Sequence, residues 1–311
     1  MNNNNNIVLE IERLKKQKNA IILGHYYQDP TIQSISDIIG DSLALAQKAI
    51  KVEADIILMC GVQFMGETVK ILNPDKKVLV PDMNAGCSLA DSCKAKDLAE
   101  MKKRYPDYKV VSYVNTSAEV KALTDVVVTS SNALSIIESF PKDEKIIFCP
   151  DRNLGSYINK ITGRNMLLWD GACHVHEGFS IDFVMSLKDI YKDSEIISHP
   201  ECKKEIVDIS DFVGSTAAMI SYVGKSSSNI FIVVTESGIL YELQKNYPDK
   251  VFIPAPPLSE RGSKNTCEYM RLNTLEKVLY TLENETPQVI IDDTLSAQAR
   301  KCIDKMLSLT I

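Results

Sequence analysis

The sequence has little of what marks a membrane, secreted or nucleic-acid-binding protein. No apolar run in its 311 residues approaches the roughly 20 needed to cross a bilayer. The segment 1–6 has neither a basic region nor an apolar core, so we predict no signal peptide and a polar, disordered tail. The formal net charge is −6, and the basic residues form no cluster that would suit nucleic acid. We therefore predict a cytoplasmic protein without a membrane or nucleic-acid partner.

Cysteine, in contrast, is abundant. The chain has eight, namely Cys60, Cys87, Cys93, Cys149, Cys173, Cys202, Cys267 and Cys302. Without a secretory signal, metal binding or catalysis explains such a number better than disulfides do. No close C-x-x-C pair is present, so a shared site would have to assemble from distant segments. Cys60 and Cys149 end apolar runs that are typical of central strands, and we assign them to the core.

A pattern of strand, hydroxyl-rich turn and helix occurs three times along the chain. The first strands are expected at 19–23, 109–113 and 195–198, the third at 55–59, 145–148 and 230–234, and the fourth at 77–80, 166–169 and 251–253. Helices are expected between them, for example at 63–72 and 238–246. The spacing from first to fourth strand is 56 residues in each copy, from Leu23 to Leu79, Ser112 to Leu168 and Ile197 to Ile253. Repeated spacing of this kind indicates repeated structural units.

Strands that alternate with helices indicate parallel sheets covered on both faces. We therefore predict an α/β protein with three similar αβα domains, each built on a parallel four-stranded sheet. Their strand ends would face one another in a pseudo-threefold arrangement around a central active site. The expected domains are 1–85 plus 268–311, 86–172 and 173–267. The segment 274–309 is predicted to form two helices that pack back onto the first domain.

The segment Leu167 to Gly178 offers metal ligands directly after a predicted strand. It contains Cys173, His174, His176 and Glu177, a mixture that suits a metal centre better than a packed core. Cys87 and Cys267 fall just past the fourth strand of the other two units. Three thiolates that meet on the axis would suit a zinc ion or an iron–sulfur cluster. Three ligands leave a coordination position open, as catalytic metals require.

The hydroxyl-rich turns form a second set of candidate residues. Ser42, Ser130 and Thr216 each lie at or near a predicted helix start, where backbone N–H groups and the helix dipole favour anions. For any one of these residues taken alone, ordinary N-capping is the better explanation. Three of them at equivalent positions point to an anionic substrate that carries phosphate or carboxylate groups.

Further polar side chains follow the first strands. They are His25, Tyr26 and Tyr27 in the first unit, Tyr113 and Asn115 in the second, and His199 and Glu201 in the third. With His176, these positions account for all but one of the four histidines. We predict that His176 and Glu201 act as acid–base groups and that Tyr113 and Asn115 bind substrate by hydrogen bonds.

At these positions the chain resembles the quinolinate synthase family, whose members act in bacterial NAD biosynthesis. The resemblance spans essentially the whole chain. It is carried by Gly24-His25-Tyr26-Tyr27, Gly40-Asp41-Ser42, Ala85-Gly86-Cys87-Ser88, Ser112-Tyr113-Val114-Asn115-Thr116, Thr129-Ser130-Ser131-Asn132, Cys173-x-Val175-His176-Glu177, His199-Pro200-Glu201-Cys202, Gly214-Ser215-Thr216, and Cys267 followed by Thr274-Leu275-Glu276-Lys277. Each motif is short, but together and in this order they are highly specific.

The resemblance implies a [4Fe–4S] cluster held by Cys87, Cys173 and Cys267, with one iron open to act as a Lewis acid. It implies that a transferase of this kind condenses iminoaspartate with dihydroxyacetone phosphate to give quinolinate, phosphate and water. It also implies a functional link to the L-aspartate oxidase that makes iminoaspartate. Some relatives carry a C-x-x-C-x-x-C run around the third ligand, whereas Cys267 stands alone here, so redox switching through such a run is not expected.

The same resemblance assigns the remaining site residues. Ser130 and Thr216, with the turn around Ser42, would hold phosphate or carboxylates. The pocket would be lined by His25, Tyr27, Tyr113, Asn115, His176, His199 and Glu201. Glu201 is the preferred proton shuttle, and Tyr27, His199 and His176 are the other catalytic candidates.

Two other functions remain open at this stage. A zinc-dependent hydrolase could use His174 and His176, whose spacing would put both rings on one side of an extended segment. No third histidine or aspartate complements that pair. A metal-sensing binding protein could use the three cysteines, but it would need an element that binds DNA or a partner, and the sequence offers none.

Overall fold

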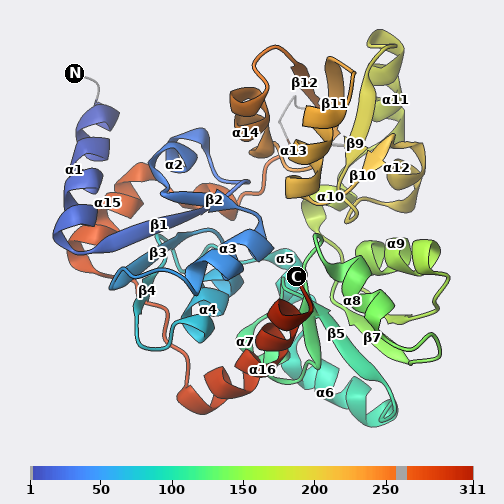
Figure 1. The fold of residues 1–311 in the computed structure, drawn as a ribbon, viewed down its shortest axis with the longest axis horizontal. Helices are drawn as coiled ribbons and strands as arrows, with labels where there is room; N and C mark the ends of the chain where they lie inside the picture. The colour runs from blue at the N-terminus through green and yellow to red at the C-terminus, as the bar shows by residue number, and fades with distance from the viewer. Residues whose placement is uncertain (1–2, 257–264, 311) are drawn as a thin grey trace.

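The computed structural model describes residues 3–256 and 265–310, and these form three four-stranded sheets with helices packed on their faces. Every pair of neighbouring strands is parallel. Figure 1 shows the three units around a common centre. The predicted fold class is therefore confirmed, while the domain boundaries remain a prediction.

The first unit contains the sheet with strand order β2-β1-β3-β4. Its elements are α1 (Asn3–Gln17), β1 (Ala20–His25), α2 (Pro30–Ile35), β2 (Ile38–Gly40), α3 (Ser42–Ala49), β3 (Ile56–Cys60), α4 (Gln63–Leu72) and β4 (Lys77–Leu79). Helix α1 begins at Asn3, so the prediction of a disordered tail is wrong for residues 3–6. These asparagines are helical because they continue a helix whose apolar side chains, such as Ile11 and Leu14, are buried.

The second unit repeats this order as β6-β5-β7-β8. Its elements are α5 (Ser88–Asp91), α6 (Ala95–Arg104), β5 (Lys109–Tyr113), α7 (Ala118–Ala122), β6 (Val126–Val128), α8 (Ala133–Ser139), β7 (Ile146–Cys149), α9 (Arg152–Thr162) and β8 (Leu167–Leu168).

The third unit has the order β10-β9-β11-β12. Its elements are α10 (His174–Glu177), α11 (Ile181–Ile190), β9 (Glu195–Ser198), α12 (Lys204–Ile209), β10 (Phe212–Val213), α13 (Thr216–Lys225), β11 (Ile230–Val234), α14 (Ile239–Asn246) and β12 (Val251–Pro254). The short helix η1 (Met270–Leu272) and the helices α15 (Leu275–Asn284) and α16 (Asp293–Leu309) follow.

Strand pairing confirms the repeat of 56 residues and corrects its position in the second unit. Equivalent pairs join the third strand to the fourth as Leu58 with Leu79, Ile147 with Leu167 and Ile232 with Ile253. The corresponding first-strand residues are Leu23, Val111 and Ile197, which pair with Ile38, Val126 and Phe212. The second copy therefore runs from Val111 to Leu167, one residue earlier than predicted, and keeps the spacing of 56.

A hydrogen-bonded aspartate marks the same place in every unit. Asp37, Asp125 and Asp211 precede the second strands, and each accepts a 2.8 Å hydrogen bond from a backbone N–H of the first strand, on Ile22, Val110 and Ile196 respectively. The aspartate N–H returns a bond to the carbonyl of that same strand residue. These two bonds fix the register between first and second strand. The repeat therefore extends to individual side-chain contacts.

The core is continuous between the first and second units. One cluster of buried side chains contains Leu23 and Ile57 of the first unit, Val111 and Phe148 of the second, and Met306 of α16. The third unit has separate clusters around Ile196 and around Phe231 and Val233. Within the described ranges, no helix is both long and apolar enough to cross a membrane.

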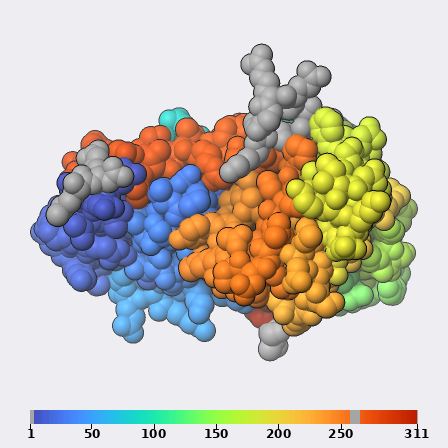
Figure 2. All heavy atoms as spheres, turned by 90° about the horizontal axis from the view of Figure 1, so that it is seen from above, coloured from blue at the N-terminus to red at the C-terminus, as the bar shows by residue number. Residues whose placement is uncertain are grey.

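The C-terminal helices pack on two different units. Helix α15 lies against α1 of the first unit, as predicted, and Figure 2 shows this segment beside the N-terminal helix. Helix α16 instead packs mainly on α7 and β6 of the second unit and also contacts α4 of the first. Its buried face of Ala299, Cys302, Ile303 and Met306 fills the space between them. The expectation that both helices return to the first domain is therefore wrong for α16.

Candidate active site

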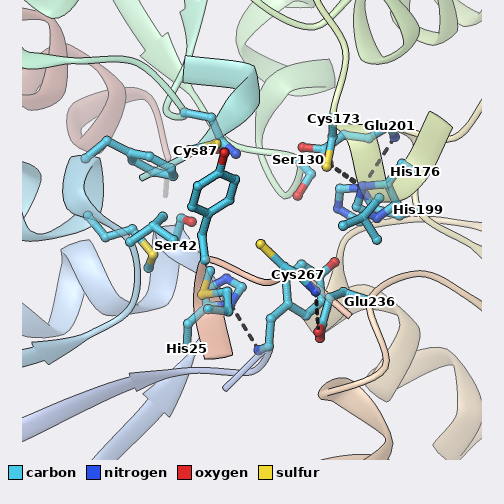
Figure 3. A pocket seen from close by; sticks show the side chains of 18 of the residues that line it. His25, Ser42, Cys87, Ser130, Cys173, His176, His199, Glu201, Glu236 and Cys267 are labelled. Atoms are coloured by element: carbon cyan, nitrogen blue, oxygen red, sulfur yellow. Dashed lines mark hydrogen bonds and ion pairs between the residues drawn. The ribbon is translucent and has the colours of Figure 1, made fainter. Parts of the chain in front are cut away.

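One cavity at the centre of the three units brings together the predicted cysteine ligands and the predicted catalytic and substrate-binding residues, whereas Tyr26 and Glu177 are not among its lining residues. It is lined by His25, Tyr27, Ser42, Cys87, Tyr113, Asn115, Ser130, Cys173, His176, His199, Glu201, Thr216 and Cys267, together with Asp41, Ser88, Thr129, His174, Glu236, Tyr269 and apolar side chains. Figure 3 shows many of these side chains pointing into the same space. Their common location agrees with the sequence analysis, while the role of each residue remains a prediction.

The strand order explains how the cavity is laid out. In each sheet the second and fourth strands are the two edges, and the first and third lie between them. The hydroxyl-rich turns follow second strands and the cysteines follow fourth strands, so they occupy opposite ends of the cavity. Three intervals between neighbouring strands separate these edges by roughly 14 Å. The loops after the first strands lie between the two ends.

The hydroxyl end is built from helix starts. Asp41 caps α3 by accepting a 2.8 Å bond from the N–H of Ala44, and Ser215 caps α13 through a 3.2 Å bond from Ala218. Ser42 and Thr216 are the first residues of these helices. Their backbone N–H groups belong to the first helical turn, where the helix itself provides no acceptor. This end of the cavity is therefore suited to an anionic group.

The loops after the first strands supply equivalent residues from all three units. His25, Tyr113 and His199 occupy one equivalent position, and Tyr27, Asn115 and Glu201 occupy the position two residues later. A chain of polar contacts joins two of these loops. The Tyr27 hydroxyl lies 2.7 Å from Thr235 Oγ1, which lies 2.9 Å from His176 Nε2.

His176 continues this chain to Glu201, in the loop after the first strand of the third unit. Its Nδ1 lies 2.7 Å from Glu201 Oε2, although the ring N–H makes no aligned hydrogen bond. The ring also stacks on His199, with centroids 4.9 Å apart. Tyr27, Thr235, His176 and Glu201 thus form an unbroken series of polar groups, all buried or half-buried.

Burial and charge set the ionisation of these groups. Burial lowers the pKa of His25 to about 4 and that of His199 to about 3, so both imidazoles are neutral near pH 7. Burial opposes ionisation of Glu201, but the neighbouring His176 and the hydroxyl of Tyr113 outweigh it and lower its pKa to about 2. Burial also raises the pKa of Tyr27 and Tyr113 well above the usual value. The centre of the cavity therefore holds one carboxylate among neutral donors.

The three predicted ligand cysteines point into the opposite end of the cavity. Cys87, Cys173 and Cys267 are half-buried and free of disulfides, and their sulfur atoms face a common space in Figure 3. Burial raises the pKa of Cys87 to about 12 and that of Cys267 to about 11, and it raises the pKa of Cys173 further. Without a cation these thiols stay protonated, so thiolates here require a positive partner.

Two buried acids hold the cysteine-bearing loops from inside. Asp151 Oδ2 accepts a 3.3 Å bond from the N–H of Cys173, and Glu236 Oε1 accepts a 3.1 Å bond from the N–H of Cys267. Glu236 also pairs with Arg271 at 2.8 Å. Burial raises the pKa of Glu236 to about 7 against the effect of Arg271, and it raises the pKa of Asp151 well above the usual value. The two acids come from equivalent positions after third strands.

Sequence reasoning missed these two acids and Thr235. All three follow third strands, at positions that correspond to Val62 and Gly61 in the first unit. The prediction considered only the loops after first, second and fourth strands, so it left out the loops after third strands. The repeat could have pointed to these residues, since the loops after third strands lie at the same edge of the sheet.

The other cysteines lie outside the cavity. Cys202 is buried in the core of the third unit, where its thiol donates to the Val234 carbonyl at 3.4 Å. Cys60 and Cys149 end third strands, and Cys302 lies in α16, as predicted. Cys93 lies in the bend after α5.

Comparison with known proteins agrees with this arrangement of residues. Residues 9–308 match the family model described as Quinolinate synthetase A protein. The chain belongs to the quinolinate synthase family. A quinolinate synthase from Chloroherpeton thalassium is 51% identical over 301 residues, which cover 97% of this chain and 94% of the relative. One from a Synechocystis species is 51% identical over 304 residues, which cover 98% and 95% of the two chains.

Membership in the quinolinate synthase family raises the question of which metal group the donors fit. Three thiols from three separate units converge on one buried space, and nearby carboxylates are already bonded to backbone N–H groups. Their ligand atoms are not among the sets that all lie within 4.8 Å of one another in the described ranges. Such wider spacing suits a multi-iron cluster better than a single ion, and thiolates are the ligands that such clusters use. The cysteine set therefore fits a [4Fe–4S] group.

A second set of donors could hold a single metal ion. One ligand atom each from Cys173, His176 and Glu201 lies within 4.8 Å of the other two. The pair proposed for a zinc hydrolase is different and does not form. His174 and His176 lie in the short helix α10, and they contact separate partners: His174 contacts Ser88 and Glu268, and His176 contacts Thr235. A helix turns residues two apart to different sides.

Proposed function

We propose that the chain is a quinolinate synthase that condenses iminoaspartate with dihydroxyacetone phosphate to give quinolinate, phosphate and water. Family membership supports the activity. The geometric support is a single observation: three cysteines, which follow fourth strands, and three hydroxyl side chains, which follow second strands, line one cavity. A metal group at one end and an anionic group at the other are what this pair of substrates requires.

Cys87, Cys173 and Cys267 would hold a [4Fe–4S] cluster in this protein. When bound, such a group supplies a Lewis acid through the iron that no cysteine ligates. Asp151 and Glu236 keep two of the three cysteine loops in place through their backbone N–H groups. The cluster would also supply the positive partner that the buried thiols need to ionise.

The hydroxyl end would bind the phosphate or carboxylate groups of the substrates. Ser42, Ser130 and Thr216 line this end, and the starts of α3 and α13 add backbone N–H donors. A substrate held there by its anionic group would extend toward the cysteines, past the residues that follow the first strands. Tyr113 and Asn115 lie on that path and can orient it by hydrogen bonds.

Proton transfer would centre on Glu201, because it is the ionised acid in the middle of the cavity. It can accept a proton from a substrate carbon or hydroxyl group when the triose loses phosphate. His176 and Thr235 link it to Tyr27, which gives a route for the proton between substrate groups. The neutral His25 and His199 serve as hydrogen-bond partners and not as fixed cations.

The test is an anaerobic assay of the iron-loaded protein. Iminoaspartate, formed from oxaloacetate and ammonium, and dihydroxyacetone phosphate are supplied, and quinolinate is separated by chromatography. The wild type should form quinolinate, and Glu201→Gln should lower kcat by about 100- to 10,000-fold, the range for loss of an acid–base group. Glu205→Gln, an exposed carboxylate four positions away, should leave kcat unchanged. Absence of quinolinate with the loaded wild type would reject the proposal.

A single metal ion bound by Cys173, His176 and Glu201 is the alternative that the geometry supports. That set of thiol, imidazole and carboxylate is one that zinc binds. Metal analysis separates the two occupants: about four irons per chain with visible absorbance indicates the cluster, whereas one zinc and no colour indicates the single ion.

We also propose that the reaction takes place in the cytoplasm beside an L-aspartate oxidase, which would supply iminoaspartate. The imine hydrolyses in water, so close supply would limit its loss. Addition of a purified oxidase with aspartate should give more quinolinate than the same amount of imine added at once. Equal yields would argue against a functional link.

A further inference from the structure

Three partly exposed side chains, two of which line the cavity, connect the loops that carry the cysteines. Ser88 Oγ lies 2.6 Å from His174 Nδ1, and His174 Nε2 lies 2.9 Å from Glu268 Oε2. Each of these residues directly follows one of the three cysteines, Cys87, Cys173 or Cys267. We call Ser88, His174 and Glu268 the outer clasp.

The outer clasp joins all three units through one imidazole. Ser88 follows the fourth strand of the first unit, His174 that of the second and Glu268 that of the third. Both ring nitrogens have a partner, and a neutral ring with its proton on Nε2 satisfies both contacts. The edge of Tyr269 also packs against the ring, with centroids 6.0 Å apart. His174 is therefore held on three sides although its side chain is 38% exposed.

The clasp complements the contacts that hold the loops from inside. Asp151 and Glu236 bind the N–H groups of Cys173 and Cys267, but each acid follows the third strand of the same sheet whose fourth strand precedes its cysteine. They fix each loop to its own sheet and not to the neighbouring loops. Among the described residues that flank the three cysteines, Ser88, His174 and Glu268 make the side-chain bonds that run from one cysteine loop to the next.

We propose that Ser88, His174 and Glu268 are positioning residues for the cysteine site. They set the separation of the three thiols and cover their outward side, so that a bound metal group is released slowly. The part that concerns a metal group rests on the proposed function. The part that concerns the thiols rests on the geometry alone.

The experiment compares variants of the full chain in two measurements. The first is the labelling rate of Cys87, Cys173 and Cys267 by a maleimide in metal-free protein, mapped by mass spectrometry. The second is the rate at which anaerobically loaded protein loses iron to bathophenanthroline disulfonate. His174→Ala should raise both rates by about 5- to 30-fold, as expected when two exposed hydrogen bonds are lost. Its unfolding midpoint should change little.

Two further variants separate positioning from a general structural effect. Glu268→Gln keeps an acceptor for the ring N–H, so both rates should stay near the wild-type values. Asp91→Asn removes an exposed carboxylate from the same short helix that Ser88 starts, but outside the clasp, where it pairs with Lys94. It should leave both rates unchanged.

The outcomes are distinct. Wild-type rates in His174→Ala would overturn the proposal, as would an equal rise in Asp91→Asn. If His174→Ala fails to fold, the Ser88→Ala and Glu268→Ala double variant is used in the same measurements. If the wild type holds no iron, the cofactor assignment fails, and the labelling rates alone support or overturn the role of the clasp.

Discussion

The hydroxyl of Ser131 donates a 2.6 Å hydrogen bond to the carboxylate of Asp41, two side chains that belong to different units. The same hydroxyl lies 2.7 Å from Ser215 Oγ of the third unit. One serine thus connects all three units at the hydroxyl end, just as His174 connects them at the cysteine end. The central cavity lies between two small sets of polar contacts, each of which links the three units through one central side chain.

Ser131→Ala should weaken the docking of the units. Loss of these bonds at a solvent-exposed position should lower the free energy of unfolding by about 0.5–1.5 kcal/mol, measured by urea denaturation. Ser135→Ala is the matched control, because that exposed hydroxyl bonds only to the Asn132 carbonyl of its own helix turn. Equal losses in both variants would show that the contact between units contributes nothing.

The cysteine variants should fall into two groups. Alanine at Cys87, Cys173 or Cys267 should give colourless protein without bound iron from anaerobic preparations, because each removes a ligand that faces the cavity. Cys202→Ala should keep its iron, because its thiol bonds to the Val234 carbonyl in the core. Iron content and visible absorbance are the measurements. If the Cys202 variant is colourless and the Cys267 variant is coloured, then Cys202 is the third ligand and Cys267 is not.

Substitution of the hydroxyls should weaken substrate binding more than catalysis. Ser130→Ala and Thr216→Ala each remove a donor at the anionic end, which should cost about 1.5–3 kcal/mol, or about 10- to 150-fold in affinity. The dissociation constant of dihydroxyacetone phosphate is measured by titration calorimetry, with Ser139→Ala as control, since that hydroxyl bonds to a carbonyl of its own helix. Unchanged affinity in both would leave helix capping as their role.

Gly238 should not tolerate a side chain. A Cβ at this position would lie 2.7 Å from the backbone Cα and C atoms of Tyr27, across the junction of the third and first units. Gly238→Ala should therefore separate these segments, lower the free energy of unfolding by about 1–3 kcal/mol and move Tyr27 away from Thr235. Gly86→Ala is the comparison, because its nearest contact would be an ordinary 3.8 Å from Tyr269. Equal stability of the two variants would show that Tyr27 can shift freely.

Glu285 should contribute stability that depends on pH. Lys18 and Lys77 bond to its carboxylate and lower its pKa from 4.5 to about 2. A lowered folded-state pKa means that the contribution is complete above about pH 4.5 and is lost as the pH falls toward 2. Glu285→Gln should cost about 0.5–1 kcal/mol at pH 7, and its difference from the wild type should narrow below pH 4.5. The exposed Glu283→Gln should show neither effect in urea denaturation at several pH values.

The threefold repeat was the basis for most of what could be predicted from the sequence. Strand pattern and the spacing of 56 residues located the three sheets and, through them, the loops that line the cavity. Those loops were predictable because the carboxyl ends of parallel strands all lie at one edge of a sheet. What remained hidden depended on side-chain contacts between units. Thr235 has no distinctive neighbours in the sequence, and its role is visible only once Tyr27 and His176 lie on either side of it.

One wrong prediction and one alternative that was not chosen show the same limit. The pattern of α16 shows an apolar face but does not say which unit receives it, and that choice depends on the groove that α4 and α7 form together. The zinc-hydrolase alternative required an extended segment at His174 and His176, but the chain forms a short helix directly after Cys173. In both cases the local sequence allowed two outcomes, and packing selected one of them.

The position of α16 has a consequence for the order in which a newly made chain can mature. A ribosome delivers the second unit well before the final helix, and domains generally begin to fold in that order. Until Asp293–Leu309 emerges, the faces of α7 and β6 that this helix covers stay exposed to water. The nascent protein therefore carries an uncovered apolar surface until this helix has been made, and truncation before Asp293 should yield a chain that chaperones retain or that aggregates.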